Sequence, residues 1–382
     1  MNRTTNHQTK DMNQQTYRKL ISGQSTSWFA ALPRFFLGAA AQLYSTGIIL
    51  RNFLYSKGWL KTHRVNAAVF CVGNITTGGT GKTPLVIWLC NKITENSKLK
   101  TQNCQCAILT RGYKATQNSK LKTQNYSDEP AILTESCPEA KVIVNPDRVA
   151  GATEAASKWG ANIIIMDDGF QHRRLGRDLD IVTIDAMCPF GYGKVLPAGL
   201  LREPVTALKR ADAVVVTRCD QTTAAELAQL EEKLQLINAD IPIAMSIHAP
   251  VCAKSPGHKI ISIEELKDKK IFAFCGIGNP NAFLDTIRKL KCNLAGWKVY
   301  NDHHRYTNND IADICEETGY LSADLIMTTQ KDWSKICNSN LSILNSQEIP
   351  FVYLVVELKF VSGEDKIIQL IEDALADKIS KK

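Results

Sequence analysis

The sequence has no cysteine pair at the spacing of a metal site and no apolar run long enough to cross a membrane. Its 12 cysteines are scattered, and no Cys-x-x-Cys pair occurs among them. We therefore expect reduced thiols in the cytosol rather than a disulfide framework or a zinc site. The first 27 residues are rich in Asn, Gln and Thr and lack the apolar core of a signal peptide. They predict a disordered polar tail over 1–27.

The chain also lacks a large excess of either charge. Its net charge of +8 is spread over 382 residues. So modest and dispersed a positive charge argues against a dedicated nucleic-acid binder, although it suits contact with anionic lipid or phosphate. The sequence indicates no nucleic-acid partner and no obligate protein partner. Its length predicts either two α/β lobes or one enlarged domain.

The segment 28–64 combines apolar and aromatic residues with flanking cations. The uncharged run between Arg34 and Arg51 falls short of the ~18 apolar residues that would credibly span a bilayer. Aromatic rings, Lys and Arg favour the headgroup region. The segment therefore predicts a helix that lies on a membrane surface. A helix packed on the protein's own core would show the same periodicity, so that alternative stays open.

A glycine-rich turn follows the apolar run 67–72, and residues 78–84 read Gly-Gly-Thr-Gly-Lys-Thr-Pro. Such a turn curls so that backbone N–H groups point at phosphate oxygens, while Lys82 adds a positive charge and the Thr83 hydroxyl can ligate Mg²⁺. The strict pattern has glycine where this chain has Thr76. The turn predicts a nucleoside triphosphate site. Its binding residues are Thr76, Thr77, Gly78, Gly79, Thr80, Gly81, Lys82 and Thr83.

The fold is predicted from short apolar runs separated by longer segments. Continuous Val and Ile runs indicate parallel strands covered on both faces, hence a doubly wound α/β core domain over 65–240. A second set of such runs begins near 271 and predicts a C-terminal α/β lobe over 271–382. The Pro- and Gly-containing range 241–270 predicts the connection between the lobes. The runs in the first lobe are 106–110, 141–144, 163–166, 179–184 and 213–216.

Acidic residues follow one of these runs. The strand 163–166 ends in Asp167 and Asp168, which in phosphate-loop proteins places an acid near Mg²⁺. Adjacent strand residues point to opposite faces, so only one of the pair can easily be a direct ligand. The polar cluster 169–174 follows at the carboxyl edge of the sheet, where ligands bind. Weaker candidates, each more often a cap or a surface pair, are Asp128, Glu129, Arg148, Arg202 and Glu203.

The combination of motifs resembles the tetraacyldisaccharide 4′-kinase family, over nearly everything from Trp28 onward. The motifs that carry the resemblance are 78–84, Thr110-Arg111-Gly112-Tyr113, Asp128-Glu129-Pro130, 167–172, 196–204, 276–280, Asp302-His303 and Lys331-Asp332. The resemblance implies an ATP-dependent kinase that phosphorylates the 4′-hydroxyl of a tetraacyldisaccharide 1-phosphate in lipid A biosynthesis. It also implies a two-lobed phosphate-loop fold with an N-terminal membrane-associated helix, at the cytoplasmic face of the bacterial inner membrane.

The resemblance further implies roles for individual residues, with ATP and Mg²⁺ as cofactors. The catalytic residues would be Asp128 as the carboxylate, His303 as its assistant and Lys82, with His304 left open as the alternative histidine. The metal-linked residues would be Thr83, Asp167, Asp168 and Glu203. The substrate-binding residues would be Arg148, Glu129, Gln171 and His172.

A membrane-associated phosphate-loop switch ATPase is the rival interpretation, because the turn at 78–83 also suits that class. Those switches often carry lysine at the position of Thr76, and its absence here lowers the rival. A direct repeat of Asn-Ser-Lys-Leu-Lys-Thr-Gln-Asn at 96–103 and 118–125 predicts a duplicated surface insertion without chemistry.

Overall fold

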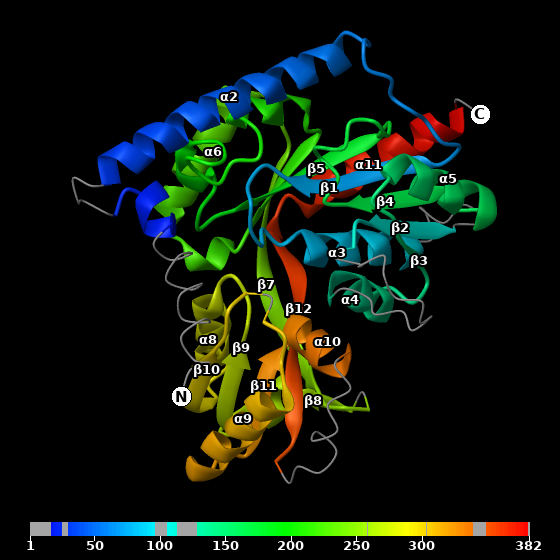
Figure 1. The fold of residues 1–382 in the computed structure, drawn as a ribbon. Helices are drawn as coiled ribbons and strands as arrows, with labels where there is room; N and C mark the ends of the chain where they lie inside the picture. Colours follow the sequence, from blue (N-terminus) through cyan, green and yellow to red (C-terminus); the bar gives the residue numbers. More distant parts are fainter. Residues whose placement is uncertain are drawn as a thin grey trace.

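The structure is a computed structural model. It describes residues 17–24, 30–95, 105–112, 128–257, 259–302, 304–338 and 349–380. Within these residues, twelve strands form one continuous sheet that extends through two lobes (Figure 1).

The larger lobe contains six parallel strands with helices on both faces. β1 lies in the middle of this part and pairs with β4 on one side and β5 on the other. Apolar layers pack against both faces of the strands, which explains their continuous Val and Ile runs. The strands are β1 (Ala68–Asn74), β2 (Cys106–Thr110), β3 (Lys141–Val144), β4 (Ile163–Asp167), β5 (Leu179–Asp185) and β6 (Ala213–Thr217). The helices are α3 (Lys82–Glu95), α4 (Asp128–Ser136), α5 (Arg148–Lys158) and α6 (Ala224–Ile237), with short 3₁₀ turns η2 (Gly191–Gly193), η3 (Val205–Arg210) and η4 (Cys219–Gln221).

The smaller lobe repeats the pattern on a reduced scale. Its three strands run parallel, and its helices cover them on both sides. The strands are β9 (Lys270–Cys275), β10 (Asn293–Val299) and β11 (Leu325–Thr329), and the helices are α8 (Pro280–Lys289), α9 (Asn308–Tyr320) and α10 (Gln330–Asn338).

Two long strands join the lobes: β7 (Ile243–Lys254) and β12 (Phe351–Ser362), which pair antiparallel (Figure 1). The sheet order is β10-β9-β11-β12-β7-β6-β5-β1-β4-β2-β3, with β8 (Ile260–Ser262) paired to β7. The range 241–270, expected to be a connection, thus contains two strands and the short helix α7 (Ile263–Leu266). Pro250 lies where the register shifts opposite Val356, and such an irregularity tolerates a proline within a strand.

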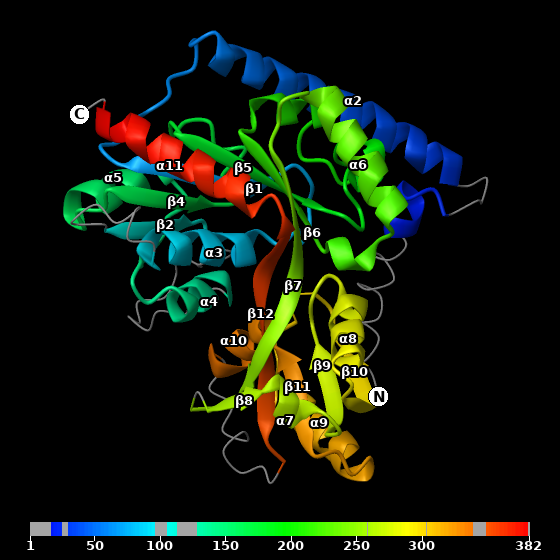
Figure 2. The same cartoon turned by 180° about the vertical axis from the view of Figure 1, so that it is seen from behind.

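The C-terminal helix α11 (Glu364–Ser380) returns to the larger lobe. Ile367 and Ile371 belong to the same apolar cluster as Val72 of β1, and Figure 2 shows α11 crossing β1 and β5. The last part of the expected lobe 271–382 therefore packs on the phosphate-loop lobe.

The N-terminal region contains the long helix α2 (Ala31–Ser56), which lies along one side of the larger lobe (Figures 1 and 2). Of the expected tail over 1–27, residues 17–24 are described and the rest lie outside the described residues. Residues 17–21 are helical, and the Tyr17 hydroxyl donates to the Pro197 carbonyl at 2.6 Å. No helix in the described part of the chain has the length and apolar character required to pass through a bilayer.

The two faces of α2 differ sharply. Ala41 is buried against the protein, and the Tyr44 hydroxyl donates to the Arg202 carbonyl at 2.9 Å. The opposite face exposes large apolar side chains, which are Leu32, Phe35, Phe36, Leu43, Ile49, Leu50 and Phe53. One face of α2 therefore packs on the protein itself, and the other face is apolar and exposed.

Candidate active site

The phosphate loop lies between β1 and α3, at the carboxyl edge of the sheet. Gly78 and Gly81 have φ values of 122° and 82°, a region that favours glycine. The start of the loop is held by a neighbouring segment, because the Thr77 amide donates to the Leu200 carbonyl at 2.7 Å. Farther along, the Thr80 hydroxyl lies 2.7 Å from that of Thr183 on β5. The loop is thus fixed by the protein at both ends.

Lys82 begins α3 and points its ammonium at the carboxylate of Asp168, with 3.4 Å between Nζ and Oδ1. Arg202 donates from one nitrogen to both oxygens of Asp168, at 2.8 and 2.9 Å. Burial raises the pKa of Asp168, but the charges of Lys82 and Arg202 outweigh it and hold the pKa below its usual value. Asp168 is therefore an ionised group engaged with two cations.

Asp167, the last residue of β4, has a different environment. It is buried, and its Oδ2 accepts a long hydrogen bond of 3.5 Å from the Thr110 hydroxyl. Its Oδ1 is also buried and accepts no hydrogen bond from any of the described residues. Burial, followed by the charge of Glu129, raises the pKa of Asp167 to about 7. A buried carboxylate oxygen without a donor fits a cation, since Mg²⁺ prefers such ligands.

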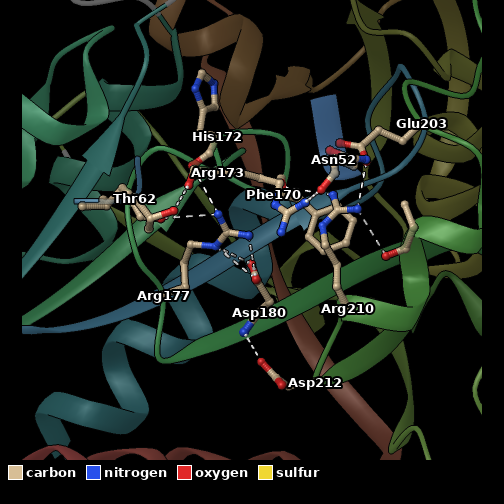
Figure 3. Close-up of polar contacts among 12 residues, drawn as sticks. Asn52, Thr62, Phe170, His172, Arg173, Arg177, Asp180, Glu203, Arg210 and Asp212 are labelled. Atoms are coloured by element: carbon tan, nitrogen blue, oxygen red, sulfur yellow. Dashed lines mark hydrogen bonds and ion pairs between the residues drawn. The ribbon is translucent and has the colours of Figure 1, made fainter. Parts of the chain in front are cut away.

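Glu203 is completely buried, but both of its oxygens have partners (Figure 3). Oε1 accepts from Arg51 at 3.1 Å, and Oε2 accepts from Asn52 at 2.9 Å and pairs with Arg210 at 2.9 Å. Arg51 and Asn52 belong to α2, and Arg210 belongs to η3. These donors occupy the carboxylate that the resemblance linked to Mg²⁺. The structure thus joins Glu203 to the N-terminal helix.

Three of the four predicted substrate-binding residues, Arg148, Gln171 and His172, line one pocket of about 220 Å³. Arg148 opens α5, and its guanidinium donates to the Asp167 carbonyl at 3.1 Å. Burial, then the charge of Arg148, lowers the pKa of His172 and favours its neutral form. The fourth residue, Glu129, does not line the pocket, although its charge acts on Asp167.

The same pocket contains three cations that were not among the predicted substrate-binding residues: Arg51, Arg173 and Arg174. The Arg173 guanidinium donates to the Asn52 carbonyl at 2.7 Å (Figure 3). It also lies 5.2 Å from the ring centre of Tyr55. Arg173 and Arg174 belong to the polar cluster 169–174, which the sequence places at the ligand-binding edge of the sheet. Arg51 could not be found in this way, because its place in the pocket depends on how α2 docks.

The two predicted catalytic residues beyond Lys82 can be placed only in part. Asp128 is the first residue of α4, and its side chain lies outside the described part of the structure, as does all of His303. The alternative, His304, has partners of its own. Its ring stacks on Tyr300 at 4.5 Å between centres, and Nε2 lies 3.2 Å from Oδ2 of Asp310. This contact joins His304 to the first turn of α9.

Motif residues of the smaller lobe gather at the carboxyl ends of β9 and β11. Asp332 is fully buried and accepts hydrogen bonds from the Gly276 amide at 2.9 Å and the Thr329 hydroxyl at 2.7 Å. Lys331 lies 3.5 Å from Asp302, the residue before His303. The turn at 276–280, the loop at 302 and the start of α10 therefore form one polar assembly.

A further contact joins the lobes. Glu135, near the end of α4, accepts a hydrogen bond from the Tyr353 hydroxyl of β12 at 2.8 Å. It also lies 3.4 Å from Nζ of Lys254 on β7 and accepts from Gln330 of α10 at 3.4 Å. The helix that begins with Asp128 is thus tied to both connecting strands and to the smaller lobe.

Comparisons with known proteins show the family of this chain. The family model described as Tetraacyldisaccharide-1-P 4′-kinase matches residues 33–376. The chain belongs to this family. It is 34% identical over 337 residues to the tetraacyldisaccharide 4′-kinase of Elusimicrobium minutum, covering 82% of this chain and 86% of the relative. The tetraacyldisaccharide 4′-kinase of Halothermothrix orenii is 32% identical, with 87% of this chain and 90% of the relative covered.

A solved structure shows the same fold for a member of the tetraacyldisaccharide 4′-kinase family. It is the "apo" form of LpxK from Aquifex aeolicus in complex with ATP, with a TM-score of 0.69 and 27% identity, covering 90% of this chain and 99% of that one. Membership confirms the resemblance read from the motifs and makes the chain a kinase. It also decides between the kinase and the switch ATPase in favour of the kinase.

Proposed function

We propose that this chain transfers the γ-phosphoryl group of ATP to the 4′-hydroxyl of a tetraacyldisaccharide 1-phosphate, using residues at the carboxyl edge of β1 and β4. The observation that carries the proposal is the arrangement of Lys82, Asp168 and Asp167 beside a glycine-rich loop. The names of the relatives and the ATP bound to the solved relative support it.

Phosphoryl transfer needs positioning and charge neutralisation more than covalent chemistry. The curled loop from Gly78 to Gly81 would hold the terminal phosphates through its backbone N–H groups. Lys82 would contribute a cation at the same place, and its ion pair with Asp168 fixes the direction of its side chain before nucleotide binds. Arg202 would support that ion pair from the other side.

Mg²⁺ would be held by Asp167 together with the Thr83 hydroxyl, and when bound it would neutralise charge on the phosphate oxygens. Asp167 is the better candidate of the adjacent acids, because its Oδ1 has no donor among the described residues whereas Asp168 is engaged with two cations. Glu203 would act instead as the anchor of α2, since both of its oxygens are occupied.

The acceptor hydroxyl would lose its proton to Asp128, with His303 as a hydrogen-bonding assistant. This part of the proposal rests on the family resemblance and on the position of Asp128 at the start of α4. The contacts of Glu135 support it, because they fix α4 against both connecting strands and against α10 of the smaller lobe.

The cationic pocket would receive the anionic end of the acceptor. Four arginines, Arg51, Arg148, Arg173 and Arg174, line it together with Gln171 and His172. Arginine pairs well with phosphate because its planar fork donates two parallel hydrogen bonds. Since Arg51 comes from α2, the pocket lies beside the helix whose outer face is apolar.

That outer face would lie on the membrane surface, at the cytoplasmic side of the bacterial inner membrane. Apolar area facing lipid, with flanking cations at headgroup depth, stabilises such a contact. The acyl chains of the acceptor would then remain in lipid while its sugar reaches the pocket. The exposure of Phe35 at 70% and Leu43 at 77% supports this placement.

The test is transfer of label from γ-labelled ATP to the lipid disaccharide. Lys82→Ala should abolish transfer while the protein stays folded, because the loop loses its cation. Lys92→Ala is the matched control: Lys92 lies on the same helix, and its ion pair with Glu364 is partly exposed, at 3.0 Å. Full activity of Lys82→Ala would refute the proposed site.

A further inference from the structure

One wall of the phosphate loop is built by residues that lie outside the predicted site. Arg218 directly follows β6 and donates from Nη2 to the Gly79 carbonyl at 2.6 Å. Its Nε also donates to Oδ1 of Asp185 at 2.9 Å, and a second contact joins Nη2 to Oδ2 of the same carboxylate. The two side chains are only 10% and 15% exposed. A nearly buried ion pair thus contacts the main chain of the loop.

The contact to Gly79 fixes the orientation of a peptide group. In a trans peptide, the carbonyl of one residue and the N–H of the next point in opposite directions. Because Arg218 holds the Gly79 carbonyl on its own side, the N–H of Thr80 faces the other way, across the loop. The backbone N–H groups of residues 78–81 donate to no acceptor among the described residues, so they are available to an anion.

The next peptide is fixed by the same wall. The Thr217 hydroxyl, one residue before Arg218, donates to the Thr80 carbonyl at 3.0 Å, which turns the N–H of Gly81 in the opposite direction. His248 of β7 closes the wall, since a Cβ on Gly81 would lie 2.7 Å from its Nε2. Two consecutive N–H groups are therefore oriented by Thr217 and Arg218, at the carboxyl end of β6.

The backbone conformation of Arg218 also supports a role in holding the loop. Its φ is 58°, in the left-handed region that costs a non-glycine residue free energy. That conformation places its side chain between Asp185 and the loop, where the guanidinium serves both.

We propose that Arg218 is a positioning residue for the triphosphate: oriented by Asp185, it holds the Gly79 carbonyl outward so that the loop N–H groups face the phosphates before nucleotide binds. The inference rests on the proposed function of residues 76–83. Arg218 acts through the loop and touches no reacting atom.

The experiment compares Arg218→Ala and Arg218→Lys with Lys378→Ala in the full-length protein. Lys378 forms a similarly covered ion pair with Asp178 at 3.1 Å, with side chains 20% and 15% exposed. Asp178 accepts from the Val69 amide near the start of β1, at the opposite end of that strand from the loop. The readouts are KM for ATP, KM for the lipid acceptor, kcat, and the shift of the thermal midpoint caused by Mg·ATP.

Arg218→Ala should raise KM for ATP by about tenfold or more, the loss expected for one charge-assisted hydrogen bond, and should shrink the thermal shift caused by Mg·ATP. KM for the acceptor should stay unchanged. Arg218→Lys should give an intermediate value, because lysine keeps the charge but loses the fork that serves two partners. Lys378→Ala should lower the thermal midpoint without changing KM for ATP.

If both Arg218 variants fold and bind Mg·ATP as the wild type does, Arg218 does not position the loop. Equal rises of KM for ATP in Lys378→Ala and Arg218→Ala would also overturn the inference, because a general loss of packing would then explain both. Lys82→Ala separates this failure from that of the proposed function: if it abolishes transfer while Arg218→Ala does not affect KM for ATP, only the role of Arg218 falls.

Discussion

Asp167 and Glu203 are both buried carboxylates in the larger lobe, but their surroundings differ in one decisive respect. Glu203 receives donors at both oxygens, from Arg51, Asn52 and Arg210. Asp167 has one oxygen with a single long hydrogen bond and one oxygen without any donor among the described residues. A buried charge without partners is unfavourable, whereas a buried charge with a full set can hold two elements together. From this difference we propose that Glu203 has a structural role and that Asp167 binds a ligand.

The largest expected effect is on stability at Glu203. Glu203→Ala leaves the half-buried Arg51 and Arg210 without the buried carboxylate that they share, and breaking such a pair costs about 3–5 kcal/mol. Urea unfolding should therefore show a large loss of unfolding free energy. Glu364→Ala is the control, because its exposed ion pair with Lys92 should be worth less than about 1 kcal/mol. Equal losses in the two variants would break the comparison.

Asp167→Asn should lower the rate of phosphoryl transfer but leave the free energy of unfolding intact. The substitution removes the charge that would hold Mg²⁺, so the rate of phosphoryl transfer should fall by about a hundredfold or more. The free energy of unfolding without metal should not fall, because a buried carboxylate that lacks a donor is removed. Measured rates and urea unfolding in EDTA check both parts. A stability loss as large as that of Glu203→Ala would mean that Asp167 is structural too.

His248 extends the comparison to a third buried group without a partner. Its Nε2 neither accepts nor donates a hydrogen bond among the described residues. Burial, followed by the charge of Arg218, lowers the pKa of His248 to about 4. The carboxylates of Asp185 and Asp220 act in the opposite direction. Between pH 6.5 and 4 the unfolded chain binds the proton and the folded chain does not. The folded state should therefore lose stability as pH falls through this window.

The measurement is the free energy of unfolding of wild type and His248→Gln at pH 7 and at about pH 4.5. The wild type should lose more than the variant on acidification, by on the order of 1–3 kcal/mol. Parallel losses in the two proteins would show that His248 is already protonated or well solvated in the folded state.

The smallest expected effect concerns Glu135, which contacts Tyr353 and Lys254 of the connecting strands and Gln330 of the smaller lobe. Glu135→Gln removes the charge that pairs with Lys254, in a contact that is partly exposed. We therefore expect the interaction free energy between the lobes to weaken by about 1 kcal/mol. This should appear as a fall of a few-fold in kcat. Glu139→Gln, an exposed acid just beyond the same helix, is the control. No difference between them would leave α4 positioned by packing alone.

The sequence predicted the strands of both lobes well, because strands buried on two faces leave continuous Val and Ile runs such as 163–166. It missed β7, whose Pro250 looks like a breaker but occupies a register irregularity. The sequence also included α11 in the C-terminal lobe 271–382, whereas the helix packs on the larger lobe. The pattern of a helix does not show which lobe it covers.

The site was predictable to a similar extent. The glycine-rich loop and Lys82 follow from local spacing, which fixes local geometry. The distinction between Asp167 and Glu203 does not, because it depends on donors far away in the chain: Arg51 is 152 residues from Glu203. Arg218 likewise carries no motif, and only the fold brings it to Gly79.

Calorimetry of ATP binding, with and without Mg²⁺, tests the central distinction most directly. We expect Mg²⁺ to strengthen ATP binding to the wild type and to Glu203→Gln, but to add little for Asp167→Asn. If Asp167→Asn keeps the full effect of Mg²⁺ while Glu203→Gln loses it, the roles assigned to the two carboxylates are reversed and the account is contradicted.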